Sequence, residues 1–269
     1  MGDPHLAGNR QPANHRAITV RALWCGLVLL WSLQGMADGR TQTDPLDSFM
    51  WQLYRERYLG DTPVRFDERV RLSAPGFAED SGQVPVDIDA SAFNGRFDRM
   101  LLWVELNPIP MVFDYQPLTH GLGRVAVNLR LEQGSAVRAA VLSEGVWYVG
   151  STFIDGAGGG CSTPGIASSG KDWSRDFGQV RARRVQTEVA NRLRFRLMHP
   201  MESGLLPSES PFYIEDVVFT SGDDTVARMT WHASISENPE LTIDMRGGDT
   251  TRYHLRARDN NGNVLEQDI

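Results

Sequence analysis

The chain has 269 residues, of which 41% are hydrophobic and 23% are charged, and its mean hydropathy is −0.33. This composition excludes a disordered chain and a polytopic membrane protein. The formal net charge of −7 has the wrong sign for binding to the phosphates of a nucleic acid or to an anionic membrane surface, so we expect neither partner. The two cysteines, Cys25 and Cys161, are too few for a disulfide framework or a four-cysteine zinc site.

The first 37 residues are typical of a secretory signal peptide. Two arginines precede an apolar run over residues 22–33, and Gly35 and Ala37 supply the small residues that a signal peptidase requires. A retained membrane anchor is the alternative, but the run is shorter than the ~20 residues that span a bilayer. We therefore expect residues 1–37 to be removed and Cys161 to be the single cysteine of a mature chain in an oxidising compartment.

One helix and many strands are predicted in the mature chain. Asp44-Pro45 opens a helix whose apolar face has three- and four-residue spacing, and Gly60 ends it. The residues of this face are Phe49, Met50, Leu53, Tyr54 and Tyr58. Beyond it, apolar and polar residues alternate, which is typical of antiparallel strands with one polar face. The alternating apolar positions are Val84, Val86 and Ile88; Val125, Val127, Leu129 and Leu131; Val137, Ala139 and Val141; Leu193, Phe195 and Leu197; Leu241, Ile243 and Met245; and Tyr253, Leu255 and Ala257. Asn94-Gly95, Glu144-Gly145 and Asn261-Gly262 supply hairpin turn signals.

A Gly- and Ser-rich segment over residues 155–177 separates two strand-rich blocks, and its composition is that of a flexible linker. The blocks, residues 38–154 and 178–269, each have the size of an immunoglobulin-like sandwich. We therefore expect an all-β chain of two immunoglobulin-like β-sandwich domains joined by a Gly-rich arm, with a short N-terminal helix. One large β-barrel or jelly roll is the alternative, but so long a Gly-rich stretch rarely interrupts a single core.

Cys161 lies on this arm, directly after Gly158, Gly159 and Gly160. A single cysteine in an exported chain is buried, paired between chains or used chemically. No apolar neighbour would draw Cys161 into a core, so we expect an exposed thiol on an arm that the three glycines make flexible. No arginine or histidine lies within nine residues of it, so the thiol should keep a pKa near ~8.5. This pattern favours a thiol that carries a group over one that catalyses a reaction.

Two other groups of residues have alternative interpretations. Met198, His199 and Met201 could ligate copper, but three such residues beside Pro200 more often form a turn, so we expect no metal site. Six arginines could form a basic stripe across neighbouring strands, although a solvated sheet face paired with nearby acids is favoured. They are Arg181, Arg183, Arg184, Arg192, Arg194 and Arg196. No Ser-His-Asp arrangement, P-loop or Rossmann fingerprint is readable, so we expect neither an active site nor a cofactor.

Several strings along the mature chain resemble two protein families. Gly158-Gly159-Gly160-Cys161, Leu72-Ser73-Ala74-Pro75, Ala78-Glu79-Asp80, Val84-Pro85-Val86 and Leu106-Asn107-Pro108-Ile109-Pro110 resemble SoxY. Phe195-Arg196-Leu197-Met198-His199-Pro200-Met201-Glu202-Ser203-Gly204, Ile235-Ser236-Glu237-Asn238-Pro239 and Asp259-Asn260-Asn261-Gly262 resemble SoxZ. The order of the two in one chain is similar to the fused SoxYZ-like carriers associated with quinoprotein dehydrogenases.

The resemblance implies a periplasmic carrier that holds a sulfur or other small group covalently on Cys161 and presents it to partner enzymes. These would be a quinoprotein dehydrogenase or sulfur-oxidising enzymes. It further implies that the blocks 38–154 and 178–269 pair with each other, and that His199, Pro200, Met201 and Glu202 have a structural role. In SoxY the cysteine stands near a free C-terminus, whereas here the chain continues into the second block. The alternative is a non-covalent adaptor of a periplasmic dehydrogenase, in which Cys161 is incidental or makes a dimer.

Overall fold

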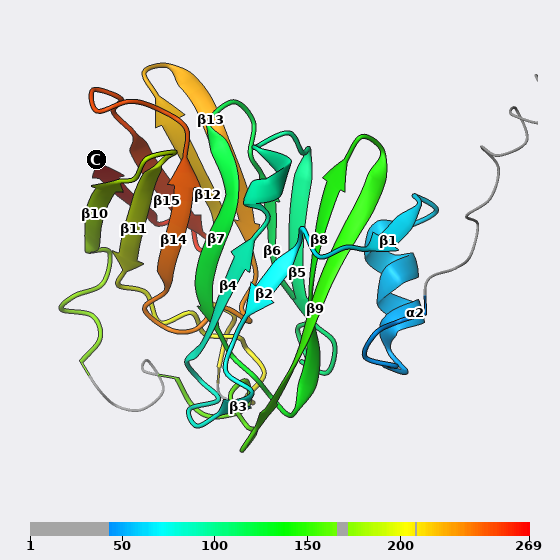
Figure 1. The fold of residues 1–269 in the computed structure, drawn as a ribbon. Coiled ribbons are helices and arrows are strands. Elements are labelled where there is room, and N and C mark those ends of the chain that lie inside the picture. Colours follow the sequence, from blue (N-terminus) through cyan, green and yellow to red (C-terminus); the bar gives the residue numbers. More distant parts are fainter. Residues whose placement is uncertain (1–42, 166–171, 208) are drawn as a thin grey trace, which may run out of the picture. The chain divides into compact units, whose positions relative to one another are not determined.

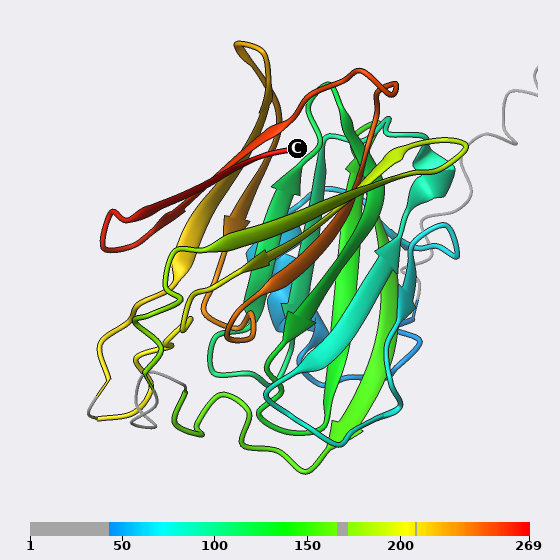
Figure 2. The ribbon, with the colours of Figure 1, turned by 90° about the vertical axis from the view of Figure 1, so that its left-hand side faces the viewer.

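The computed structural model describes residues 43–165, 172–207 and 209–269, which form two β-sheets packed face to face and a short helix (Figures 1 and 2). The expected all-β class with a short N-terminal helix is confirmed. The predicted signal peptide, residues 1–37, lies outside the described residues. Within the described ranges, no helix is long and apolar enough to cross a membrane.

The larger sheet has ten strands in the order β1-β9-β8-β5-β6-β13-β12-β15-β16, with β3 paired to β9 beside this path. Its strands are β1 (Val64–Phe66), β3 (Phe77–Ala78), β5 (Arg99–Val104), β6 (Met111–Gln116), β8 (Ser135–Ser143), β9 (Val146–Gly156), β12 (Ile214–Ser221), β13 (Asp224–Trp231), β15 (His254–Asp259) and β16 (Val264–Asp268). The smaller sheet has six strands in the order β10-β11-β14-β7-β4-β2. These are β10 (Val180–Gln186), β11 (Asn191–Leu197), β14 (Glu240–Met245), β7 (Gly121–Leu129), β4 (Val84–Asp89) and β2 (Arg71–Ser73).

The predicted alternation places the apolar side chains between the sheets, where all of the positions given above are buried. Two of the three predicted turns are hairpin turns: Glu144-Gly145 joins β8 to β9, and Asn261-Gly262 joins β15 to β16. Asn94-Gly95 instead ends the short 3₁₀ helix η2 (Ser91–Phe93), with both residues at positive φ. It lies on a connection between the two sheets, because β4 belongs to the smaller sheet and β5 to the larger.

The two strand-rich blocks share both sheets. In the larger sheet β6 pairs antiparallel with β13, so that Phe113 lies opposite Trp231. In the smaller sheet β7 pairs antiparallel with β14, so that Val127 lies opposite Leu241. Buried side chains of both blocks form one hydrophobic cluster between the sheets. The blocks are therefore held together by two hydrogen-bonded ladders and a common core, and Figure 1 shows the strands of both running side by side.

The N-terminal helix covers the outer face of the larger sheet. It consists of α2 (Trp51–Tyr54) and a π-helical turn, η1 (Arg55–Leu59), and ends at Gly60 as predicted. Its buried face centres on Trp51, which stacks on Trp103 of β5. Phe49 and Leu53, which belong to the predicted apolar face, are exposed.

The reason for this orientation is a buried arginine beneath the helix. Arg138 of β8 pairs with Asp44 (Nη1–Oδ1 2.5 Å) and Glu105 (Nε–Oε1 2.9 Å), and its guanidinium lies 5.0 Å from the Trp51 ring. The same Asp44 carboxylate accepts hydrogen bonds from the backbone N–H groups of Leu46 and Ser48. A tertiary ion pair, which the helical periodicity does not contain, thus sets which face of the helix is buried.

Candidate functional site

The arm leaves β9 at Gly156 and lies in a groove between Ser81 and the end of β7. Its first two residues are still strand, because Asp155 and Gly156 pair with β3. The N–H of Gly158 then donates to Ser81 Oγ (3.1 Å). The N–H groups of Gly159 and Gly160 donate to the main-chain oxygens of Glu132 (2.8 Å) and Leu131 (3.0 Å). In this structure the arm is therefore docked on the sandwich.

The three glycines have a packing reason in this docked conformation. Gly158 and Gly159 adopt φ values of 83° and 78°, which L side chains rarely adopt. A Cβ on Gly160 would lie 2.0 Å from the main-chain oxygen of Ser81 and 2.8 Å from that of Leu131. Only glycine fits at the point where the arm touches the groove most closely. The flexibility predicted for these residues stays a prediction.

Cys161 is only 5% exposed, so the expectation of an exposed thiol is wrong for this conformation. Its N–H and that of Ser162 both donate to Glu132 Oε2, at 3.0 Å and 3.1 Å. The hydroxyl of Ser162 donates to Glu132 Oε1 at 2.7 Å. One carboxylate thus accepts three hydrogen bonds from two consecutive arm residues. These bonds draw Cys161 inward, although no apolar residue stands next to it in the sequence.

The surroundings of the thiol disfavour its ionisation. Burial raises the pKa of Cys161 to about 12, and the negative charge of Glu132 acts in the same direction. Arg130, which follows β7, opposes them. The sequence indicated an unperturbed thiol because no cation is near in the chain, whereas the fold brings a carboxylate and a guanidinium to it. The docked Cys161 is therefore a protonated thiol at neutral pH and a poor nucleophile.

Arg130 is a buried cation that joins the two blocks. It is 6% exposed, and its guanidinium donates to the main-chain oxygens of Met201 (2.6 Å), Pro200 (3.4 Å) and Ala233 (3.4 Å). Burial lowers its pKa from the ordinary value. These acceptors are neutral, and no carboxylate of the described residues lies within ion-pair distance of it. Arg130 thus holds the end of β7 against the segment that contains the His-Pro-Met-Glu motif.

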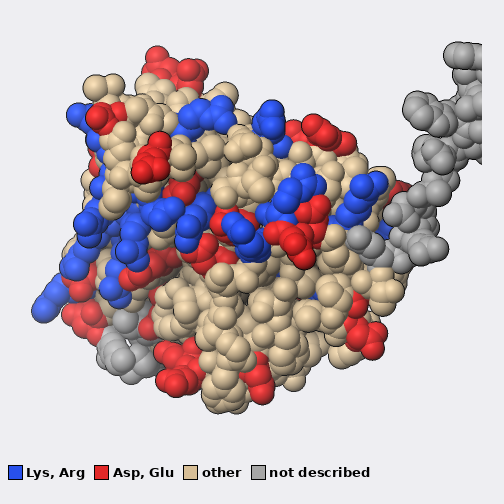
Figure 3. Space-filling view, in the orientation of Figure 1, with Lys and Arg blue, Asp and Glu red and all other residues tan. Residues whose placement is uncertain are grey.

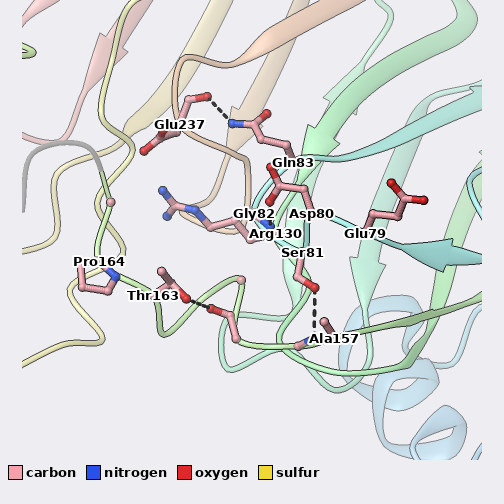
Figure 4. A pocket seen from close by; sticks show the side chains of 14 residues that line it. Glu79, Asp80, Ser81, Gly82, Gln83, Arg130, Ala157, Thr163, Pro164 and Glu237 are labelled. Carbon is pink, nitrogen blue, oxygen red and sulfur yellow. Dashed lines mark hydrogen bonds between the residues drawn. The ribbon is translucent and has the colours of Figure 1, made fainter. Parts of the chain in front are cut away.

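A polar cavity of about 340 Å³ lies between the docked arm and Arg130 (Figure 4). Its walls are the arm on both sides of Cys161 (residues 157–160 and 163–165), the loop over residues 79–83, Arg130 and Glu237. Figure 4 shows the Arg130 side chain extending between Glu237 and Thr163. Cys161 itself is not part of the wall.

The His-Pro-Met-Glu motif is buried beside this cavity. His199 is 1% exposed; its Nδ1 accepts the N–H of Met201 (3.0 Å), and its Nε2 lies 3.3 Å from Asp259 Oδ2. Nδ1 accepts, so the network assigns the proton to Nε2. Burial lowers the pKa of His199 to about 4, against the opposing effect of Asp259, so the ring is neutral at pH 7.

The other motif residues make main-chain contacts. Met201 is fully buried at a φ of 51°, and Pro200 is buried beside it. The backbone of Glu202 pairs with Phe212 in both directions (2.7 and 2.9 Å), and its carboxylate lies against Gly165 of the arm. The structural role expected for the four residues stays a prediction. No group of three or more His, Cys, Asp or Glu side chains suited to a metal ion occurs in the described part of the chain.

The six arginines of the predicted stripe divide into three groups. Arg192 pairs with Asp244 (2.7 Å) and Arg196 with Glu240 (3.5 Å), as a solvated sheet face requires. Arg184 instead donates to the main chain of residues 249 and 251. For Arg181, Arg183 and Arg194, no ion pair occurs among the residues with described positions. Figure 3 shows the resulting basic area over β10 and β11 on the face of the smaller sheet.

Glu132, Arg130 and Ser81 were not predicted as site residues. Arg130 occupies a polar position in the alternation that runs from Val125 to Leu131, where arginine is ordinary on a solvated face. Glu132 follows the last apolar residue of that alternation, and Ser81 lies in a short loop. No local pattern distinguishes these residues, because the segments that they contact are adjacent to them only in the folded chain.

Two family models match the chain. The family model "Sulfur oxidation protein SoxY" matches residues 55–161, and "Sulphur oxidation protein SoxZ" matches residues 180–269. No curated protein matches the chain. A solved structure of the sulfur carrier protein SoxY from Chlorobium limicola f thiosulfatophilum is 18% identical, covering 40% of this chain and 96% of that chain, with a TM-score of 0.36. With a SoxY match followed by a SoxZ match, this chain joins a SoxY-family domain and a SoxZ-family domain in one polypeptide.

Proposed function

We propose that this protein is a carrier of a sulfur-oxidation system that holds a sulfur or other small group covalently on Cys161. The observation that carries the proposal is where the family matches lie: the SoxY match ends at Cys161, and the SoxZ match begins after the arm, at Val180. The sulfur carrier function belongs to the SoxY protein of the solved structure and is transferred here as a proposal. We assign the chain no catalytic reaction of its own.

The geometry of the docked arm adds a condition to this function. A thiol that is 5% exposed, with its pKa raised to about 12, cannot meet a partner enzyme in place. The arm must therefore leave its groove for loading and for transfer. It is tethered at both ends, between β9 and β10, so the thiol is presented at the tip of a loop.

The setting of the carrier is also part of the proposal. The secretory signal predicted over residues 1–37 supports export, and we propose a periplasmic location. The partners that receive the arm are then periplasmic sulfur-oxidising enzymes or a quinoprotein dehydrogenase, as the order of the fused domains suggests. Pairing of the two domains within the chain replaces the association of separate SoxY and SoxZ chains.

The buried thiol favours one second candidate, a non-covalent adaptor in which Cys161 carries nothing. Intact-mass spectrometry of non-reduced protein, purified from its native source in each growth state, distinguishes the two. A carrier shows an added mass that a reductant removes and that a Cys161→Ser variant lacks. An adaptor shows a bare thiol throughout. The same spectra report whether the chain begins after Ala37.

A further inference from the structure

The arm is held mainly by polar contacts. Between residues 157 and 165 the apolar side chains are few, and Thr163 and Pro164 are exposed. The docked state depends on the three hydrogen bonds to the Glu132 carboxylate, on the one to Ser81 Oγ, and on those to the main-chain oxygens of Leu131 and Glu132. Hydrogen bonds to an ionised acceptor are among the stronger ones, but water can replace each of them. Opening of the arm is therefore a local event that leaves the common core intact.

Charge is the second property of this contact. The Glu132 carboxylate receives the N–H of Cys161 itself, so any negative group on that residue is held close to another negative charge. A neutral thiol avoids this repulsion and tolerates burial. Arg130 attracts a negative group there, but burial and the charge of Glu132 together outweigh it and raise the pKa of the Cys161 thiol. The docked arm thus accommodates a neutral Cys161 and disfavours an anionic one.

We propose that Glu132 is the positioning residue of the arm, which holds the unloaded arm closed, and that an anionic group attached to Cys161 releases it. This inference rests on the proposed carrier function. It names the class of group, an anion, that distinguishes the loaded carrier from the empty one. An empty carrier hides its thiol from oxidants, whereas a loaded carrier presents its group to an enzyme.

The first test measures how strongly Glu132 holds the arm closed, which we call the latch. It uses the full chain with Cys25→Ser, so that Cys161 is the single thiol. In Glu132→Gln the charge is lost and one acceptor oxygen becomes a donor. We expect the folded variant to react with a maleimide about tenfold faster than the parent. Ser162→Ala removes one of the three hydrogen bonds and should give a smaller increase. The melting temperature should stay unchanged, because the arm contributes little to the core.

Glu79→Gln is the matched control. It removes the same charge from an exposed side chain that lines the cavity but accepts none of these hydrogen bonds. Its maleimide rate should equal that of the parent. An unchanged rate in Glu132→Gln, or an equal increase in Glu79→Gln, overturns the assignment of the latch.

The second test measures release by charge. The parent and Glu132→Gln are labelled to completion with 2-sulfonatoethyl or 2-aminoethyl methanethiosulfonate. The Cys161 thiolate attacks the sulfenyl sulfur, a disulfide forms, and methanesulfinate leaves with the electron pair of the broken S–S bond, while the thiol proton passes to solvent. The two adducts are of similar size but opposite charge. We expect proteinase K to nick residues 156–165 about threefold faster in the anionic adduct.

The difference between the adducts should disappear in Glu132→Gln. Equal nicking of both adducts in the parent, or faster nicking of the cationic adduct, overturns release by charge. The carrier function is tested separately by the native mass spectra. If those spectra show a bare thiol and nicking depends on the charge of the adduct, the carrier function is refuted and release by charge is supported. If they show a native adduct on Cys161 and both adducts are nicked equally, the carrier function is supported and release by charge is refuted.

Discussion

Two turns meet near Arg130, and they are held by different kinds of interaction. The arm around Cys161 is fixed by hydrogen bonds to Glu132 and to main-chain oxygens, with few apolar contacts. The turn around His199 is fixed by burial, by aromatic packing against the Phe212 ring 4.5 Å away, and by a buried hydrogen-bond network that includes Asp259. The first kind of contact can be exchanged for water at small cost, whereas the second cannot. The comparison indicates one turn that opens and one that remains closed.

Asp259→Ala should have the largest effect, because it removes the centre of the buried network. Asp259 accepts hydrogen bonds from the N–H groups of Asn261 and Asn263 (2.9 and 2.8 Å) and from the side chain of Asn263 (2.8 Å), and it faces His199. We expect the free energy of unfolding to fall by about 3–5 kcal/mol in denaturant titrations. Asp268→Ala, at a side chain that is 90% exposed, should cost ~0.5 kcal/mol at most. Similar losses of unfolding free energy in Asp259→Ala and Asp268→Ala would contradict the assignment of the His199 turn to the stable part of the fold.

Acid should have the second-largest effect on stability, and it should act through His199. The folded-state pKa of His199 is about 4, below its ordinary value of 6.5, so the unfolded chain binds a proton that the folded chain does not. The free energy of unfolding should therefore fall as the pH decreases from 6.5 to 4, by about 3 kcal/mol for this group, and level off below. His232, whose pKa burial also lowers, contributes in the same direction. His199→Gln should reduce the slope of the free energy of unfolding against pH, and the reduction measures the contribution of His199. An unaltered slope would refute this contribution.

Gly160→Ala should open the arm without affecting the other turn. The added Cβ would collide with the main-chain oxygen of Ser81, 2.0 Å away, so the docked conformation is lost. We expect the maleimide rate of Cys161 to rise about tenfold while the denaturation midpoint stays constant. Gly76→Ala, where a Cβ meets nothing within 4 Å, is the control and should change neither quantity. A drop in the midpoint of Gly160→Ala alone would mean that the arm is part of the cooperative fold.

Cys161→Ser should have a small effect on stability. The free energy of unfolding should change by ~0.5 kcal/mol at most, because the arm opens locally and contributes little to the core. Cys161→Ala, which introduces no new polar group, should cost no more. A loss as large as that of Asp259→Ala would assign the thiol to the structural core and weaken the proposal of a carrier.

The alternation of apolar residues by itself determined the strands of this protein. At Val84, Val86 and Ile88, as in the other alternating runs, a period of two leaves one apolar face, which has to be buried against a second sheet. The Gly-rich arm and the family strings were likewise readable, because both are local patterns. Hairpin turns at Glu144-Gly145 and Asn261-Gly262 followed from residues that tolerate positive φ.

Only the tertiary structure decided where Cys161 lies and which face of the helix is buried. The thiol is drawn inward by Glu132, and the helix is oriented by Arg138 of a distant strand. In both cases one charged side chain contacts a segment far away in the chain, and such contacts leave no periodic signal in either segment. Burial of apolar residues is a property of a pattern, whereas a hydrogen bond between two particular side chains exists only after the fold has brought them together.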